Sequence, residues 1–244
     1  QELKKSLPGS NAAIVQVDFS ENYTNKQKDE VQSAYFGHEN FSIYTVCAWY
    51  GEGEEVRCKS FCIVSDQMNH DKFVAYHCNK LILEQVRSVK PDIDTVHFWS
   101  DGAASQFKSK FCFYLLTLYP SELKMTWHFF ESHHGKGPVD GIGGRVKSSV
   151  YSDVKAGKVV VSSAKEFAEY ANGRVKAITT IFVSSEDIIA TQLNDIEIVS
   201  VPGTKRVHCV ERISTSQSSF TLRFFVNSQF TKTEQPFREV QYNV

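Results

Sequence analysis

The sequence predicts an α/β layered domain followed by a small β-rich appendage. Three β-type runs precede the first helical pattern, strands and helices then alternate, and from about residue 175 only short β-type runs recur between Gly, Pro, Ser and Asn. The expected order is β-β-β-α-β-α-β-α, with a core over residues 12–190 and an appendage over 196–244. A chain of 244 residues with 41% hydrophobic residues is long enough for one large domain plus such an appendage.

The first three strands are predicted from apolar runs and one turn. Residues 12–17 form a buried strand with Asp18 at its end. Residues 41–50 and 56–64 are β-type runs separated by a Gly-Glu-Gly-Glu turn at 51–54, which indicates an antiparallel hairpin.

The alternating part follows from helical spacing and breakers. An apolar stripe through Val74, Cys78, Ile82 and Val86 predicts a helix that ends near residue 89. The remaining expected elements are a strand at 95–99, a helix at 107–118, a strand at 125–130, a helix from Pro138 with apolar residues four apart from 142 to 154, a helix at 163–172, and β-type runs at 177–183, 196–201, 206–213 and 219–226.

Charge and cysteine content exclude several classes of protein. The net charge of −1 means that the whole molecule does not attract nucleic acid, so such a role would need a local basic surface and metal ions. The six cysteines lack the spacing of a zinc site, and we interpret them as buried free thiols in a reducing compartment. No signal peptide or bilayer-spanning run is present, so we expect a nuclear or cytoplasmic protein without a membrane partner.

Three acids stand in related positions along the predicted sheet. Asp18 follows the first strand, Asp101 follows the fourth, and Asp140 lies on the helix after the fifth. Sites in α/β sheets lie at the carboxyl ends of strands, and three carboxylates there would hold two divalent ions about 4 Å apart for phosphodiester cleavage. Mg²⁺, or Mn²⁺ in its place, suits such ligands. The alternative is that strand-end Asp residues only form turns.

The glycines around Asp140 require an explanation. The predicted helix places Gly143, Gly144 and Lys147 beside Asp140 on its exposed side. Glycine inside a helix costs about 1 kcal/mol relative to alanine. We interpret the glycines as room for another backbone or a phosphate, while a flexible Gly-rich loop with a solvated Asp remains the alternative.

Three stretches together resemble a known family. They are Val17-Asp18-Phe19-Ser20-Glu21-Asn22-Tyr23, Trp99-Ser100-Asp101-Gly102-Ala103-Ala104-Ser105-Gln106-Phe107-Lys108 and His134-Gly135-Lys136-Gly137-Pro138-Val139-Asp140-Gly141-Ile142-Gly143-Gly144. They look like transposon-derived proteins of a largely uncharacterised invertebrate family with the RNase H-like fold. The resemblance covers residues 12 to about 185.

That resemblance implies the catalytic domain of a DDE/DDD-type transposase or integrase that acts on DNA, with Mg²⁺ or Mn²⁺ as cofactor and a homo-oligomer on DNA. Asp18 and Asp101 match its acidic pattern. We predict Asp140 as the third acid, with Glu131 as the alternative, because many such enzymes use Glu there. By the same analogy Asp71 would supply a fourth carboxylate from the first helix, or would only cap that helix.

Further residues near the acids are candidates for substrate contacts. Glu21 and Asn22 would bind metal-bound water or cap the following segment. The candidates for phosphate contact, each of which has a solvated surface residue as its alternative, are His134, Lys136, Lys108 and Lys147.

Two functional hypotheses follow. The leading one is a metal-dependent polynucleotidyl transferase or nuclease core from a transposase or its domesticated descendant. The other is a catalytically silent nucleic-acid-binding or scaffold module that kept the fold. The first requires that Asp18 and Asp101 lie on adjacent strands, and we also expect the appendage to pack beside the central sheet without joining it.

Overall fold

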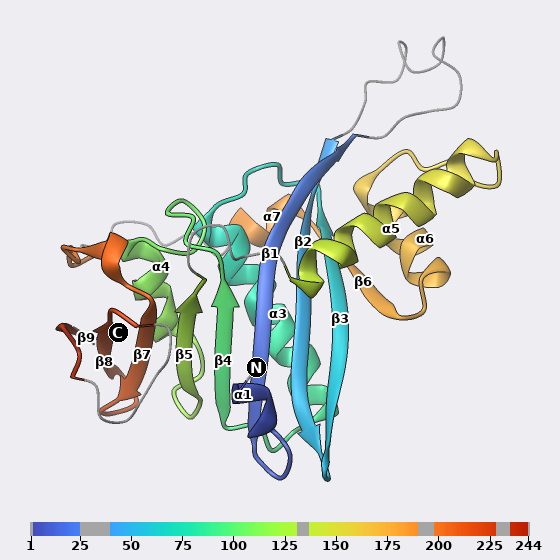
Figure 1. Ribbon diagram of the computed structural model, residues 1–244. Helices are drawn as coiled ribbons and strands as arrows, with labels where there is room; N and C mark the ends of the chain where they lie inside the picture. Colours follow the sequence, from blue (N-terminus) through green and yellow to red (C-terminus); the bar gives the residue numbers. More distant parts are fainter. Residues whose placement is uncertain (1, 25–39, 131–136, 190–197, 228–234, 244) are drawn as a thin grey trace.

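The computed structural model describes residues 2–24, 40–130, 137–189, 198–227 and 235–243 (Figure 1). The helices are α1 (Glu2–Lys5), α3 (Lys72–Val89), α4 (Lys110–Leu115), η1 (Leu116–Leu118), α5 (Pro138–Lys155), α6 (Ala164–Arg174), α7 (Ser185–Ile189) and η2 (Thr204–Arg206). The strands are β1 (Ala12–Thr24), β2 (Asn40–Glu52), β3 (Glu55–Ser65), β4 (Thr95–Ser100), β5 (Lys124–Phe129), β6 (Ile178–Val183), β7 (Cys209–Ser214), β8 (Ser219–Phe225) and β9 (Arg238–Asn243).

The strands of the described residues form one mixed sheet in the order β6-β3-β2-β1-β4-β5-β7-β8-β9. Within it β1, β2 and β3 pair antiparallel, while β4 and β5 join β1 in parallel. The order β3-β2-β1-β4-β5 with this direction pattern is that of the RNase H-like fold. The predicted fold class is therefore confirmed, and the described elements from β1 to α5 follow the predicted order, with the unpredicted α1 before them.

Helices cover both faces of the central strands, which explains why β1 reads as a continuous apolar run. Val15 and Val17 face the core that is shared with α3 and α4, and Ile14 faces the core that is shared with α5 and α6. Figure 1 shows α5 in front of β2 and β3, with its first turn beside β1, and α3 behind the sheet. The two helical layers therefore belong to opposite faces.

The helix predicted over residues 107–118 is shorter than expected. It begins at Lys110, because the Ser109 hydroxyl accepts a hydrogen bond from the Cys112 N–H, and it tightens into η1 after Leu115. Residues 103–108 form turns instead, in which the N–H groups of Gln106, Phe107 and Lys108 donate to the Ala103 carbonyl.

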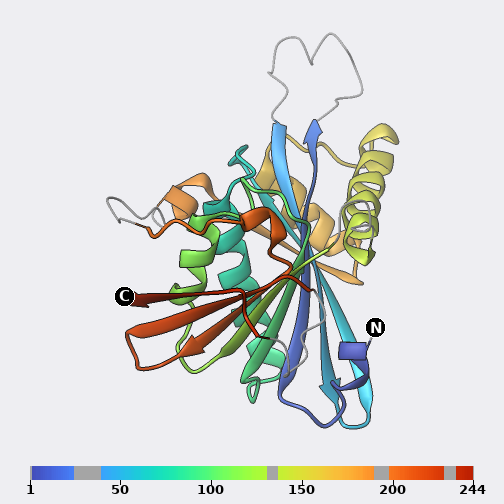
Figure 2. The same ribbon diagram turned by 60° about the vertical axis from the view of Figure 1, so that its left-hand side comes forward.

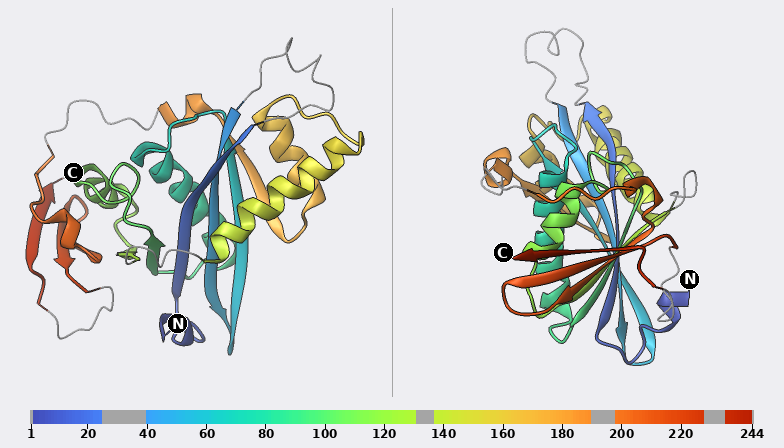
Figure 3. Two further views of the ribbon diagram at one scale, coloured as in Figure 1. Left: turned by 45° about the horizontal axis from the view of Figure 1, so that its top comes forward. Right: turned by 90° about the vertical axis from the view of Figure 1, so that its left-hand side faces the viewer.

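The C-terminal strands correct one expectation. The segment from β7 to β9 is antiparallel, as predicted, but it joins the central sheet, because β7 pairs antiparallel with β5. Figures 2 and 3 show these strands continuing the twist of the sheet. An unpaired β5 edge would expose a row of backbone donors and acceptors, and β7 satisfies them. Residues 198–201 form no strand, and β9 was not expected.

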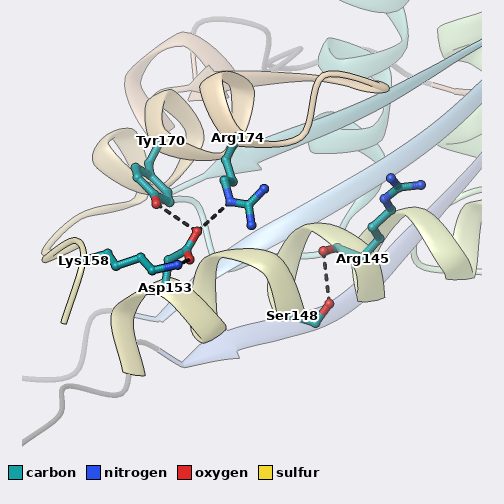
Figure 4. Close-up of polar contacts among 6 residues, drawn as sticks. All are labelled: Arg145, Ser148, Asp153, Lys158, Tyr170 and Arg174. Atoms are coloured by element: carbon teal, nitrogen blue, oxygen red, sulfur yellow. Dashed lines mark hydrogen bonds and ion pairs between the residues drawn. The ribbon is translucent and has the colours of Figure 1, made fainter. Parts of the chain in front are cut away.

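A buried acid fastens α5 to α6 (Figure 4). The side chain of Asp153 is 4% exposed and accepts bonds from Lys158 Nζ (3.0 Å), Arg174 Nε (2.7 Å) and the Tyr170 hydroxyl (3.0 Å). These partners, with Arg174 first, lower the pKa of Asp153 from 3.8 to about 2. The anchor fixes the C-terminal half of the helix that carries Asp140.

We expect Asp153→Asn to destabilise the protein in a pH-dependent way. The pKa of the carboxyl is depressed in the folded state, so its contribution to stability is present above pH 3.8 and is lost as the pH falls through about 2. Urea unfolding midpoints of parent and variant should differ at pH 7 and converge at pH 2. Ser148→Ala is the control, because that exposed hydroxyl bonds only to the Arg145 carbonyl of the same helix. An equal effect of both variants would contradict the assignment.

No helix among the described residues is both long enough and apolar enough to cross a membrane.

Candidate functional site

Asp18 lies inside β1, not at its end. The antiparallel pairing of β1 with β2 continues past a bulge between Ser20 and Tyr23 as far as Thr24. The parallel pairing with β4, however, stops at Gln16 opposite Trp99. Continuing that register by two residues places Asp18 opposite Asp101. The two acids therefore lie just beyond the point where the parallel pairing of β1 with β4 ends.

Helix α5 approaches β1 on either side of Asp18. A Cβ on Gly137 would meet the Gln16 side chain, and a Cβ on Gly143 would lie 2.6 Å from Ser20 Oγ. Gln16, Asp18 and Ser20 alternate onto this same face of the strand. Asp140 is in the helical turn between the two glycines, so the fold carries its backbone across β1 at Asp18.

This contact revises the interpretation of the glycines. Gly143 is buried against β1 and β2, so the backbone that it admits is the protein's own, and it does not belong to the exposed side of α5. Gly144 is exposed with open space around its α-carbon, as expected.

Gly143 and Gly144 should respond to alanine in opposite directions. Alanine at 143 would put its Cβ 2.9 Å from Ser20 Cβ and 3.3 Å from Thr45 Cγ2, and we expect a loss of about 1–3 kcal/mol in the free energy of unfolding. Alanine at 144 meets nothing within 4 Å and should stabilise the helix by about 0.5–1 kcal/mol. Urea denaturation of both variants measures this difference, and stabilisation at 143 would show that the close approach does not exist.

The electrostatics of Asp18 show that the three acids share one region. Burial, followed by the charges of Asp101 and then Asp140, raises the pKa of Asp18 from 3.8 to about 6. A hydrogen bond from the Phe19 backbone acts against this shift. The fold therefore brings together carboxylates that repel one another, an arrangement that costs stability.

Asp101 and Asp140 also have local backbone partners. Asp101 Oδ1 accepts from the Ala103 N–H at 3.1 Å, and Asp140 Oδ2 accepts from the Gly137 N–H at 3.0 Å. The second bond caps α5, where a negative charge in the first turn is also favoured by the helix dipole. In the part of the chain that the structure describes, no three metal-ligating side chains are already gathered into one coordination cluster.

Two of the three lysines predicted to contact substrate lie among the described residues, and both have partners within the protein. Lys147 Nζ donates to the Glu21 carbonyl at 3.1 Å, which ties α5 to the bulge of β1. Lys108 Nζ lies beside Gly102 and donates to the Lys205 carbonyl at 3.2 Å. Burial lowers the pKa of Lys108. Neither ammonium is thus an isolated charge on the surface.

The remaining candidates are dispersed. Asp71 Oδ1 accepts from the N–H groups of Phe73 and Val74 and caps α3, which packs on the face of the sheet opposite to α5. Glu21 and Asn22 are exposed beyond Asp18 on β1. Glu131, His134 and Lys136 lie outside the described residues.

Three polar neighbours of Asp18 were not expected. Gln16 and Ser20 flank it on the same face of β1, and Thr45 Oγ1 on β2 donates to the Asp18 carbonyl at 3.2 Å. The two-residue alternation of polar side chains at 16, 18 and 20 was the available signal in the sequence. It was obscured by the assumption that β1 ended at residue 18.

The strand order defines an RNase H-like α/β protein, in which Asp18 lies on β1, Asp101 directly follows β4 and Asp140 lies in the first turn of α5. The chain belongs to the family described as "Domain of unknown function (DUF8701)", whose model matches residues 1–222. No curated protein matches the chain.

Solved structures with some similarity include two of the human cytomegalovirus terminase nuclease domain. The Mn-soaked, inhibitor-bound form has 12% identity and a TM-score of 0.29, with 72% of this chain and 68% of that chain covered. The other has 11% identity and a TM-score of 0.28, with 77% and 78% covered. NurA with manganese has 10% identity and a TM-score of 0.18, with 97% and 51% covered. Similarities at these TM-scores carry no argument, and the fold assignment rests on the strand order.

Proposed function

We propose that this chain is a metal-dependent nuclease or polynucleotidyl transferase core that cleaves phosphodiester bonds of DNA, derived from a transposase. The observation that supports it is the convergence of Asp18, Asp101 and Asp140 from two adjacent parallel strands and one crossing helix. In the leading form of the proposal the protein acts in the nucleus as a homo-oligomer on DNA.

The donor set fits Mg²⁺ or Mn²⁺. Both are hard cations that take carboxylate oxygens and keep water for substrate phosphates. Bound ions would neutralise charge on a scissile phosphate and activate water at neutral pH. Asp18, Asp101 and Asp140 are the residues that would hold them, and bound cations would offset the charges of Asp101 and Asp140 that contribute to the raised pKa of Asp18.

The chain's own residues have separable roles in this proposal. Asp18 is positioned by β1, where Thr45 Oγ1 donates a hydrogen bond to its backbone carbonyl. To serve as a metal ligand, Asp140 would have to give up the hydrogen bond from the Gly137 N–H. Alternatively, one carboxylate oxygen would keep that bond while the other binds the metal. Lys147 keeps α5 and β1 in register and does not need to touch substrate.

The test uses the parent protein, Asp140→Asn and Glu131→Gln. Calorimetric titration with Mn²⁺ and cleavage of a labelled DNA duplex are measured together, with chelator as the negative control. We expect metal binding and cleavage by the parent, and loss of both in Asp140→Asn. The unfolding midpoint of each variant is recorded, because Asp140 also caps α5. If Glu131→Gln does not cleave the duplex and Asp140→Asn does, then Glu131 and not Asp140 is the third carboxylate of the site.

The second candidate is a silent nucleic-acid-binding or scaffold module. The hydrogen bonds from backbone N–H groups to Asp101 and Asp140 favour it, because they give both carboxylates a structural role, in a turn and in a helix cap. This candidate predicts no calorimetric signal with Mn²⁺ and no cleavage by the parent, together with retained binding of DNA in a gel-shift assay at low salt.

A further inference from the structure

Two cysteines meet across the β2–β3 hairpin. Cys47 on β2 and Cys58 on β3 have their sulfur atoms 3.0 Å apart. In the register Cys47 is opposite Ser60, and Cys58 is opposite Trp49, so the two thiols are diagonal neighbours on one face of the hairpin. All six cysteines are free thiols in the structure.

The pair is asymmetric in a way that suits oxidation. Cys47 is buried, whereas Cys58 is exposed, which corrects the expectation that the thiols are buried. Lys4 Nζ lies 3.3 Å from the centre of the Trp49 ring, on the residue opposite Cys58. A hydrogen bond from Cys47 lowers the pKa of the Cys58 thiol, and the positive charge of Lys4 lowers it further.

The other four thiols lack this combination. Cys62, Cys78 and Cys209 are buried, and Cys112 is half-buried beside Ser109. Burial raises the pKa of Cys62 to about 12, and it also raises the pKa of Cys78 and of Cys112. A reactive cysteine needs both thiolate character and access to solvent, and within this set Cys58 has both.

We propose that Cys47 and Cys58 form a reversible disulfide on exposure to a hydroperoxide, with Cys58 as the attacking thiol and Cys47 as the resolving thiol. This modification site does not depend on the proposed nuclease function. It rests on the contact of the two sulfur atoms and on the exposure of one of them.

The chemistry balances without further reactants. The Cys58 thiolate attacks one peroxide oxygen, the O–O bond breaks, and hydroxide leaves and takes up a proton as water, which produces a sulfenic acid. The Cys47 sulfur then attacks the Cys58 sulfur, the S–O bond breaks, and a second water leaves with the Cys47 proton. Two thiols and one hydrogen peroxide thus give one disulfide and two waters.

The experiment treats the full chain with hydrogen peroxide in the absence of divalent metal and follows each cysteine by non-reducing peptide mapping. We expect a Cys47–Cys58 disulfide that dithiothreitol reverses, with Cys58 consumed about tenfold faster than Cys112. Cys112→Ser is the matched control and should leave this disulfide unchanged. Lys4→Gln should slow the consumption of Cys58.

Two variants separate the roles of the thiols. Cys47→Ser should leave a Cys58 sulfenic acid that dimedone traps, and Cys58→Ser should leave Cys47 reduced. Because the mapping of the parent protein needs no variant to fold, it decides the matter by itself. Oxidation of Cys112 before Cys58, or a disulfide from Cys58 to any cysteine other than Cys47 of the same molecule, would overturn the proposal.

Discussion

Replacing Asp18 by Asn is expected to lower Mn²⁺-dependent DNA cleavage by about a thousandfold or more, because positioned metal ions supply several kcal/mol of charge stabilisation in phosphoryl transfer. Asp101→Asn should have a similar effect, since both acids lie where the β1–β4 ladder opens. Single-turnover cleavage of a labelled duplex measures it. Asp92→Asn is the control, because that exposed acid pairs with Lys90 and lies before the opposite end of β4. This variant should cleave the duplex at the parent rate.

The same Asp18 variant should be more stable than the parent without metal. The pKa of Asp18 is raised to about 6 in the folded state, so its contribution to stability is greatest below pH 3.8 and is lost as the pH rises through about 6. Asp18→Asn should therefore raise the urea midpoint at pH 7.5 and lose that advantage at pH 3.5. An active variant, or one that is less stable at pH 7.5, would contradict the assignment of Asp18 to a carboxylate site.

Replacing Arg212 by Leu is expected to destabilise the protein by at least about 3 kcal/mol, because it would leave buried backbone carbonyls without donors. Arg212 on β7 is buried, and its guanidinium donates four hydrogen bonds of 2.5–3.0 Å, to the carbonyl oxygens of Leu116, Tyr119, Pro120 and Leu123. Burial lowers the pKa of Arg212 to about 10, so it stays charged at neutral pH. The bonds join β7 to the segment between α4 and β5.

The matched control is Arg223→Leu on β8. Arg223 Nε pairs with Glu239 at 2.7 Å, and both side chains are more than 40% exposed, so we expect a change within about 0.5 kcal/mol. Arg212→Lys should recover only part of the stability, because an ammonium has three donors and no planar fork. Chemical denaturation compares the three variants. If Arg223→Leu lowers the free energy of unfolding as much as Arg212→Leu does, the four hydrogen bonds of Arg212 have no special role in stability.

The acids illustrate how far the candidate site could be predicted. Apolar runs that end in an acid located Asp18 and Asp101, and parallel strands bring their carboxyl ends to one edge. The extension of β1 to Thr24 was missed, because its last residues are polar and are held by pairing with β2. Gly143 was noticed as unusual, but the neighbour that requires it, Ser20, lies far away in the sequence.

The sequence by itself determined the order of strands and helices from β1 to α5, because the periodicity of apolar side chains is a local property. It thereby determined the RNase H-like sheet and the helices on both of its faces. Only the tertiary structure decided which distant atoms meet: β7 pairs with β5, Arg212 bonds to the carbonyl of Tyr119, Cys58 contacts Cys47, and Gly143 packs against Ser20. These contacts depend on strand register and on the twist of the sheet, which are set by the packing of the whole chain and leave no periodic signal in any one segment.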